Sequence, residues 1–300
     1  MGYLFLSLAL AAGIIKGYCG KRTAGAIEHS SDSMVMNCLR MGLCVIIGFV
    51  LILLQGELSS LTGDAALVWI ALLSGVSTAA FVVAWLLSIR SGAYMMVEVF
   101  LLIGVIVPIT LCRIFLGEPI TLRQIIAICI LVVAVYIMCT YNASIKGKLK
   151  PRAIAVLLLC GFGNGFADFS QKLFVKARPT ANIAVFNFYT YLFAGTVLLV
   201  ACIVFRSADQ KRGAQLRAPL SVIKPIWLYV LIMAACLFAY SFFKTRAASC
   251  LDAVRLYPLS QGASVLLSLL MSSVFFKERI NARCLVGIVL SFGALLMLNL

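Results

Sequence analysis

The chain has 300 residues, of which 63% are hydrophobic and 12% are charged, and its formal net charge is +15. A soluble domain is about 45–50% apolar and about 25% charged, so this composition excludes an ordinary soluble protein and indicates a polytopic membrane protein. The basic residues fall mainly between apolar runs, where they meet anionic lipid headgroups, so the net charge does not indicate nucleic-acid binding.

Ten apolar runs are long enough to cross a membrane, because a span needs about 17–25 residues. Backbone polar groups in lipid must be satisfied within the segment, so each run is predicted to be a helix, and the run length excludes a β-barrel. The first run lacks the basic start and the cleavage site of a signal peptide, so it is counted as a span. The predicted spans are residues 3–20, 34–54, 66–88, 92–115, 121–141, 153–175, 181–205, 225–244, 250–275 and 280–300.

A polar stretch over residues 142–152 separates the first five predicted spans from the last five. We therefore expect one repeat over residues 1–141, a linker, and a second repeat over residues 153–300. The fourth span of each half ends in a related turn, FLGE at Phe115–Glu118 and FFKE at Phe275–Glu278. Because the number of spans in each half is odd, the halves are expected to cross the membrane in opposite orientations, as in many secondary transporters.

These features resemble the EamA-type branch of the drug/metabolite transporter superfamily. The resemblance covers the whole chain and rests on the paired turns, the five-plus-five division and the glycine-rich first span of each half, LAAGIIKGYCGK and LLCGFGNGFADF. It implies an all-α membrane protein with ten transmembrane helices arranged as two inverted five-helix repeats. It also implies a secondary transporter.

The carboxylates of the two related turns, Glu118 and Glu278, stand at the start of the next predicted helix. A carboxylate at such a place caps exposed backbone N–H groups and complements the helix dipole. We therefore predict structural capping roles for both residues in preference to substrate contact.

Polar residues in the sixth span share one helix face, since Asn164, Asp168 and Lys172 are spaced i, i+4, i+8. An ionised group in lipid costs at least about 2.5–3.5 kcal/mol on insertion scales, so such groups face a cavity or a partner. Asp168 and Lys172 are in the favourable order for an i,i+4 pair. Asn164 and Asp168 are predicted to line a substrate cavity, whereas Lys172 either lines it or reaches the membrane surface.

Further candidates lie in the fourth and ninth spans. Tyr94 and Glu98 are i,i+4 neighbours in the fourth span, and Glu98 is the first acid of that run. Arg255 occupies a similar place in the ninth span, and Tyr257 and Gln261 follow it with i,i+4 spacing. Glu98 is predicted either to couple protons or to pair permanently with a cation such as Arg255.

The remaining candidates lie in the first and seventh spans. Lys16 follows a stretch of small residues in the first span, so it is either a snorkelling anchor or a cavity cation. Asn187 and Tyr191 lie on one face of the seventh span and are predicted to line the pathway. The predicted substrate-binding residues are thus Lys16, Tyr94, Glu98, Asn164, Asp168, Asn187, Tyr191, Arg255, Tyr257 and Gln261.

The basic residues are distributed unequally between the two sides of the predicted bundle. More Lys and Arg fall on the side of the 142–152 linker and the 205–225 loop than on the side of the termini. The positive-inside rule therefore places these two loops in the cytoplasm and both termini outside. The family resemblance instead implies cytoplasmic termini, so the orientation stays open here.

The candidate cations outnumber the candidate acids, which favours an anionic or zwitterionic metabolite, such as an amino acid or an organic acid. We expect transport across the cytoplasmic membrane by alternating access. The alternative is proton-coupled efflux of cationic or apolar drugs that uses Glu98. An intramembrane enzyme would need an acid pair, a metal motif or a nucleophile–base dyad, and a channel would need a filter loop or charged rings; the sequence has neither pattern.

No cofactor, metal site or disulfide framework is predicted. Most of the 11 cysteines lie in apolar runs, no C-x-x-C motif occurs, and the single histidine, His29, lies in a polar loop. The sequence has no G-x-x-x-x-G-K-[ST] loop, so an ion or solute gradient is expected to supply the energy. The predicted partners are a small-molecule substrate, the lipid bilayer and, as one option, protons, for a monomer or a weak homodimer.

Overall fold

The computed structural model describes residues 1–24, 30–62, 64–90, 97, 100–102, 104–146, 151–211, 219–276 and 282–299. Within these residues the regular structure is helical and no strand occurs, in agreement with the predicted all-α class. The helices are α1 (Gly2–Ala24), α2 (Ser30–Leu54), the 3₁₀ helix η1 (Leu58–Leu61), α3 (Ala65–Arg90), α5 (Ile106–Leu116), α6 (Leu122–Lys146), α7 (Pro151–Ala177), α8 (Ile183–Lys211), α9 (Pro219–Ile223), α10 (Trp227–Cys250), α11 (Ala253–Phe276) and α12 (Ala282–Asn299).

Several of these helices can cross a membrane. In the described part of the chain, six helices are long and apolar enough to do so by length and composition. They contain the segments Gly2–Gly20, Ser31–Leu54, Ala65–Trp85, Ile154–Ala177, Ile183–Lys211 and Trp227–Cys250. Each of the ten predicted spans overlaps a helix, and six of them meet these criteria. The chain is therefore a multi-pass membrane protein.

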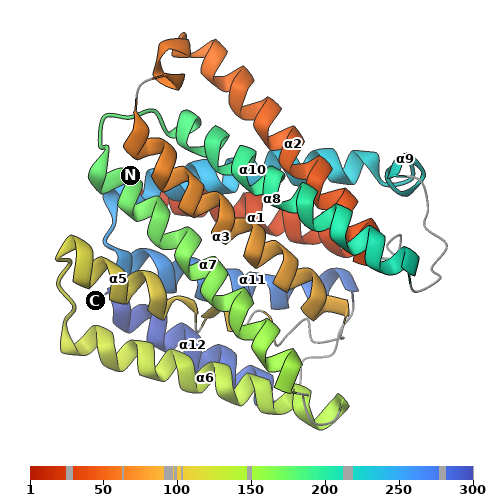
Figure 1. Cartoon of the computed structure of the whole chain (residues 1–300). Coiled ribbons are helices and arrows are strands. Elements are labelled where there is room, and N and C mark those ends of the chain that lie inside the picture. Colours follow the sequence, from red (N-terminus) through yellow and green to blue (C-terminus); the bar gives the residue numbers. More distant parts are fainter. Residues whose placement is uncertain are drawn as a thin grey trace.

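Helices from the two halves of the sequence pack against each other throughout the bundle. α1 packs against α10, α2 against α8 and α10, α3 against α7 and α8, and α6 against α12. Figure 1 shows the long helices running side by side, with α2 at one edge of the bundle and α6 at the other. Both chain ends lie at the same end of the bundle (Figure 1). The interior is thus built jointly by the two halves.

Glycines in α7 allow its neighbours to approach closely. A Cβ atom added to Gly104, which lies just before α5, would stand 3.0 Å from the Gly161 Cα atom of α7. A Cβ atom added to Gly163 would stand 2.9 Å from the backbone nitrogen of Phe81 in α3. Small residues permit such backbone contact between membrane helices. The glycine-rich sequence of α7 therefore places its polar face deep between α3, α5 and α10.

The FLGE turn has a specific geometry. Gly117 ends α5 in the left-handed conformation, with φ 67° and ψ 21°. Its N–H donates a hydrogen bond to the Cys112 carbonyl. Glycine adopts this conformation without a steric penalty. The turn directs Glu118 into the bundle, where the residue is 7% exposed.

The prediction that Glu118 caps the next helix is wrong. At the start of α6 the Gln124 Oε1 atom accepts a hydrogen bond from the Thr121 N–H, at 2.9 Å. The Thr121 hydroxyl oxygen accepts one from the Gln124 N–H in return, at 3.3 Å. This reciprocal pair is a capping box, so α6 is capped by its own residues. Glu118 is consequently available for contacts elsewhere.

Candidate functional site

Buried polar side chains run through the interior of the bundle, and we call this set the polar core. All of its members are buried, although they come from segments far apart in the sequence. They are Glu118 after α5, Asp168, Gln171 and Lys172 of α7, Asn187 of α8, Ser241 and Lys244 of α10, and Tyr257 of α11.

Asp168 and Lys244 form the first ion pair of the polar core. The Lys244 Nζ atom lies 2.6 Å from Asp168 Oδ1, and the two side chains are 2% and 5% exposed respectively. The same ammonium group lies 5.4 Å from the ring centroid of Tyr240 and 5.5 Å from that of Tyr257, within the range of cation–π attraction. The Tyr257 hydroxyl donates to the backbone carbonyl of Asp168 at 2.6 Å. These contacts tie α7, α10 and α11 together.

Lys172 and Glu118 form the second ion pair. The Lys172 Nζ atom lies 3.0 Å from Glu118 Oε1 and also donates to the Ala248 carbonyl at 3.1 Å. The other oxygen of Glu118 accepts a hydrogen bond from the N–H of Ala253, the first residue of α11, at 2.7 Å. Glu118 thus caps α11, where its charge also complements the helix dipole. Lys172 does not pair with Asp168, although their i,i+4 order would favour it, because each residue has a partner from another segment.

Neutral polar groups connect three helices beside the ion pairs. The Ser241 hydroxyl donates to Asn187 Oδ1 at 2.7 Å, and Gln171 Nε2 donates to the Ser241 oxygen at 3.4 Å. Among the described residues, Asn187 Nδ2 and Gln171 Oε1 have no hydrogen-bond partner. Buried groups of this kind are normally satisfied, so these two offer hydrogen-bonding capacity to a water molecule or a solute.

Two further predicted residues adjoin the polar core. Lys16 of α1 is half-buried, and its Nζ atom lies 4.7 Å from the ring centroid of Tyr240. Tyr240 therefore lies next to two cations, Lys16 and Lys244. Tyr191 of α8 is buried, and its hydroxyl donates to the Leu237 carbonyl at 3.2 Å.

The other predicted residues have diverse environments. Asn164 is half-buried, and its Nδ2 atom has no hydrogen-bond partner within the described ranges. Gln261 is buried in α11, whereas Arg255 is exposed in the first turn of the same helix. Three predicted residues lie outside the described residues: Tyr94, Glu98 and Glu278.

Sequence analysis missed two buried cations. Lys244 stands at the end of the predicted eighth span, but α10 continues to Cys250 and places Lys244 inside the bundle. Arg40 of α2 is only 6% exposed and was not singled out, although it is an isolated charge within an apolar run. An isolated charge of this kind is itself a sign of a functional position.

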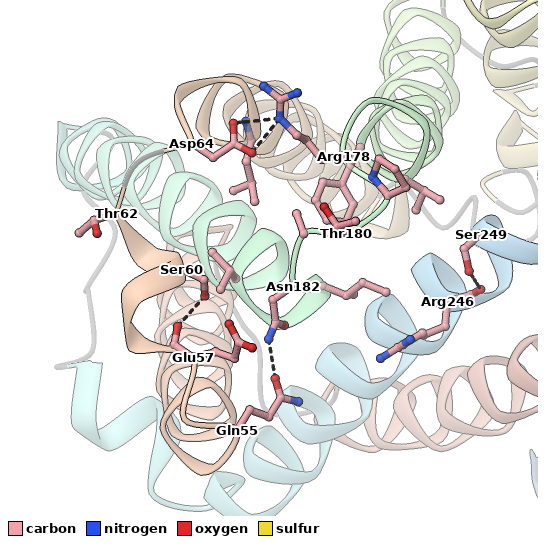
Figure 2. A pocket seen from close by; sticks show the side chains of 17 residues that line it. Gln55, Glu57, Ser60, Thr62, Asp64, Arg178, Thr180, Asn182, Arg246 and Ser249 are labelled. Atoms are coloured by element: carbon pink, nitrogen blue, oxygen red, sulfur yellow. Dashed lines mark hydrogen bonds and ion pairs between the residues drawn. The ribbon is translucent and has the colours of Figure 1, made fainter.

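A pocket of about 810 Å³ lies at one end of the bundle (Figure 2). We call it the outer pocket. Two contacts cross it between the α2–α3 and α7–α8 connections: Arg178 Nε lies 2.8 Å from Asp64 Oδ2, and Asn182 Nδ2 donates to Gln55 Oε1 at 2.7 Å. Figure 2 also shows Arg246 of α10 on the opposite side of the pocket.

The Asp64–Arg178 pair is partly exposed, in contrast to the pairs of the polar core. The side chains are 30% and 43% exposed for Asp64 and Arg178 respectively. Desolvation raises the pKa of Asp64, but hydrogen bonds from the Leu67 N–H and the Arg178 guanidinium outweigh it. The pKa therefore lies below its ordinary value of 3.8. The carboxylate thus caps the start of α3 and holds the α7–α8 connection.

Two stacked aromatic rings pack beside the outer pocket. The ring centroids of Phe174 and Phe186 lie 4.2 Å apart with an interplanar angle of 8°. Phe174 borders the outer pocket and lies one turn from Gln171 of the polar core. Both rings pack in a buried apolar cluster with Ile52 and Val185. A packed apolar layer therefore forms part of the wall of the outer pocket.

The buried charges of the described residues comprise two ion pairs and two further groups. Lys172 and Lys244 are neutralised by Glu118 and Asp168, while Arg40 and Asp32 of α2 are further buried charges of opposite sign. Within the described residues, no group of three or more His, Cys, Asp or Glu side chains could hold a metal ion.

Comparisons with known proteins agree with this architecture. Residues 151–300 match the model of the EamA-like transporter family. No curated protein matches the chain. A protein of known crystal structure has the same fold, with a TM-score of 0.76 and 13% sequence identity, over 99% of this chain and 95% of that one.

Proposed function

Since the chain belongs to the EamA-like transporter family and is a membrane transporter of the drug/metabolite kind, we propose that it moves a small anionic or zwitterionic metabolite across the cytoplasmic membrane by alternating access. An amino acid or an organic acid fits this description. The solute would bind between the halves of the bundle, beside the polar core.

The observation that carries this proposal is the charge of the interior. Among the described residues, the buried cations are Arg40, Lys172 and Lys244, and the buried acids are Asp32, Glu118 and Asp168. Glu118 and Asp168 pair with the two lysines, whereas Asp32 lies in the first turn of α2, eight residues before Arg40, which corresponds to about 12 Å along the helix axis. Charges inside a membrane are expensive and usually serve a pathway or a partner. Arg40 belongs to neither ion pair, and a buried cation of this kind favours a solute that carries a carboxylate or a similar anionic group.

The helix packing supports two repeats, over residues 1–141 and 153–300. If α1, α2, α3, α5 and α6 correspond to α7, α8, α10, α11 and α12, the contact of α1 with α10 corresponds to that of α7 with α3. In the same way α3–α8 corresponds to α10–α2, and α1–α11 to α7–α5. The contacts α2–α8 and α6–α12 map onto themselves. The family match begins at residue 151, within the predicted linker, which agrees with a second repeat of this extent.

The two ends of the bundle suggest how access would alternate. Phe174 lines the outer pocket and stacks on the buried Phe186, so we infer that these rings close the interior of the bundle at this end. Opening would separate these rings and release the Asp64–Arg178 and Gln55–Asn182 contacts. Each of these contacts joins connections on opposite sides of the pocket, so rocking of one repeat against the other would break them together.

Counterflow into liposomes tests the proposal. Purified protein is reconstituted, the liposomes are loaded with unlabelled solutes, and uptake of radiolabelled amino acids and organic acids is measured. We expect counterflow of at least one acid by the wild type and a strong loss in Lys244→Met. Lys176→Met is the matched control, because Lys176 is an exposed lysine in the last turn of α7 and its loss should leave uptake unchanged.

The same liposomes test the alternative function. Counterflow of no acid, together with efflux of a lipophilic cation that Glu98→Gln abolishes, would contradict the anion proposal. That result would favour proton-coupled drug efflux instead. Uptake of an acid that is lost in Arg255→Ala would add Arg255 to the pathway.

A further inference from the structure

Arg40 is a deeply placed cation of α2. It lies nine residues from the start of the apolar segment Ser31–Leu54, which corresponds to about 14 Å along the helix axis. Its side chain is 6% exposed, and the apolar cluster next to it contains Met41, Cys44, Tyr191 and Phe238. An arginine at this depth is too far from either end of the helix for easy snorkelling.

Arg40 lacks a counter-ion in the described part of the chain. Its Nε atom is buried without a hydrogen-bond partner. Cys44 and Tyr191 interact electrostatically with its guanidinium, and both are neutral as thiol and phenol. Arginine cannot lose its proton in a protein, so the charge persists. A buried charge without a partner is strongly destabilising, which makes this position hard to explain by packing alone.

Unpartnered polar atoms occur on the two helices that meet at Arg40. Asn37 lies one turn before Arg40 in α2, and its Oδ1 atom has no partner among the described residues. Asn187 and Thr190 lie on α8 within one turn of Tyr191, and Asn187 Nδ2 and Thr190 Oγ1 are likewise unpartnered in the described ranges. The guanidinium, the Asn187 amide and the Thr190 hydroxyl supply donors, which suit a ligand with acceptor oxygens.

From these observations we propose that Arg40 binds the carboxylate of the transported solute, an inference that rests on the proposed transport function. The planar guanidinium fork matches the two oxygens of a carboxylate. The buried lysines Lys172 and Lys244 already have carboxylate partners, so one unneutralised arginine suits one negative charge better than a phosphate dianion. Tyr191 and Phe238 provide an apolar surface for the body of the solute.

Equilibrium binding to the full chain in lipid nanodiscs tests the assignment. The probes are radiolabelled succinate, L-glutamate and L-leucine, the corresponding carboxamides, and inorganic phosphate. We expect the wild type to bind at least one carboxylate and to bind its amide about tenfold or more weakly. Arg40→Met should bind that carboxylate about ten- to hundredfold more weakly and lose the discrimination, because it removes a charge-assisted hydrogen bond.

Two variants control for folding and for net charge. Arg40→Lys keeps the buried charge but loses the fork, so it should fold normally and bind the carboxylate about tenfold more weakly. Arg113→Met removes an exposed arginine from the last turn of α5 and should leave the affinity unchanged. Arg40→Met should unfold at a temperature no lower than the wild type, because it removes a buried charge that lacks a partner.

The outcomes separate this inference from the transport function. Equal carboxylate affinity in Arg40→Met and the wild type would overturn the inference, as would binding of phosphate alone or of no carboxylate probe. Counterflow measured on the same proteins reports on transport separately. If Arg40→Met loses carboxylate binding while the wild type shows no counterflow, Arg40 is a carboxylate-binding residue and the transport proposal fails. If the wild type transports acids and Arg40→Met does so equally well, the transport proposal stands and the inference fails.

Discussion

The polar core and the outer pocket each contain a close acid–base pair in a different environment. Lys244 and Asp168 lie 2.6 Å apart with side chains 2% and 5% exposed, whereas Arg178 and Asp64 lie 2.8 Å apart with side chains 43% and 30% exposed. The distances are almost equal. What differs is access to water, which screens the outer pair and is excluded from the inner one. The difference teaches that burial, more than distance, determines what each pair contributes.

The largest expected effect comes from breaking the buried pair on one side only. Lys244→Met leaves Asp168 as a buried carboxylate without its partner, which costs about 3–5 kcal/mol of unfolding free energy. Replacing both members, as in Asp168→Leu with Lys244→Met, removes both buried charges and should restore most of that loss. Reversible unfolding in mixed detergent micelles measures these differences.

Arg178→Met is the matched variant in the outer pocket. It should change the unfolding free energy by less than about 1 kcal/mol, because the remaining Asp64 is solvated. Equal losses in Arg178→Met and Lys244→Met would mean that water reaches the polar core as freely as it reaches the outer pocket. The comparison between the two regions would then be wrong.

A smaller effect is expected at the second buried pair. Glu118→Gln leaves Lys172 without its counter-ion, but Lys172 still donates to the Ala248 carbonyl and the Ala253 N–H keeps a neutral acceptor. We therefore expect a loss of about 1.5–3 kcal/mol of unfolding free energy, the range for hydrogen bonds that involve a charged group. Glu118→Ala also removes the cap of α11 and should cost about 1 kcal/mol more. Equal stability of the two variants in the same unfolding assay would exclude the capping role.

Two glycines with positive φ, one near each region, extend the comparison of the polar core with the outer pocket. Gly117 has φ 67° and precedes the buried Glu118, whereas Gly56 has φ 68° and adjoins Gln55 of the outer pocket. Alanine in this conformation costs about 1–2 kcal/mol at either position. Gly117→Ala should cost more than Gly56→Ala, because any relaxation of the turn also displaces Glu118 from Lys172. Equal losses in the unfolding assay would indicate that Glu118 keeps its contacts without the turn.

The positions of the helices were largely predictable from the sequence. A long apolar run in lipid must satisfy its own backbone hydrogen bonds, so its composition alone is enough to predict a helix. The end of α10 is an exception. The predicted span ended at residue 244, but the helix continues to Cys250. Asp168 of α7 supplies the partner that makes the buried lysine tolerable, and this partner is 76 residues away in sequence.

The contacts of the candidate site were much less predictable. The i,i+4 spacing placed Asp168 and Lys172 on one helix face but could not indicate their partners, because packing brings Lys244 and Glu118 closer. Glu118 was expected to cap a helix, and it does. The sequence of the turn could not indicate that the capped helix would be α11, which comes from a distant part of the chain. The capping box of Thr121 and Gln124 was readable in the sequence and would have excluded α6.

The smallest expected effect lies at Asp64, and it has a defined pH dependence. Because the pKa of Asp64 in the folded protein lies below its ordinary value of 3.8, the ionised carboxylate stabilises the fold at neutral pH. That contribution is fully present above the ordinary value and is lost as the pH falls through the lower, folded-state value. Asp64→Asn should therefore lower the unfolding free energy by about 0.2–1 kcal/mol at pH 7, the range of exposed pairs, and the difference should shrink below about pH 4. High salt should reduce the effect at pH 7, because both side chains are reached by ions, whereas the loss in Lys244→Met should persist. A salt-independent effect at Asp64 would place this pair in the same low-dielectric environment as Asp168 and Lys244.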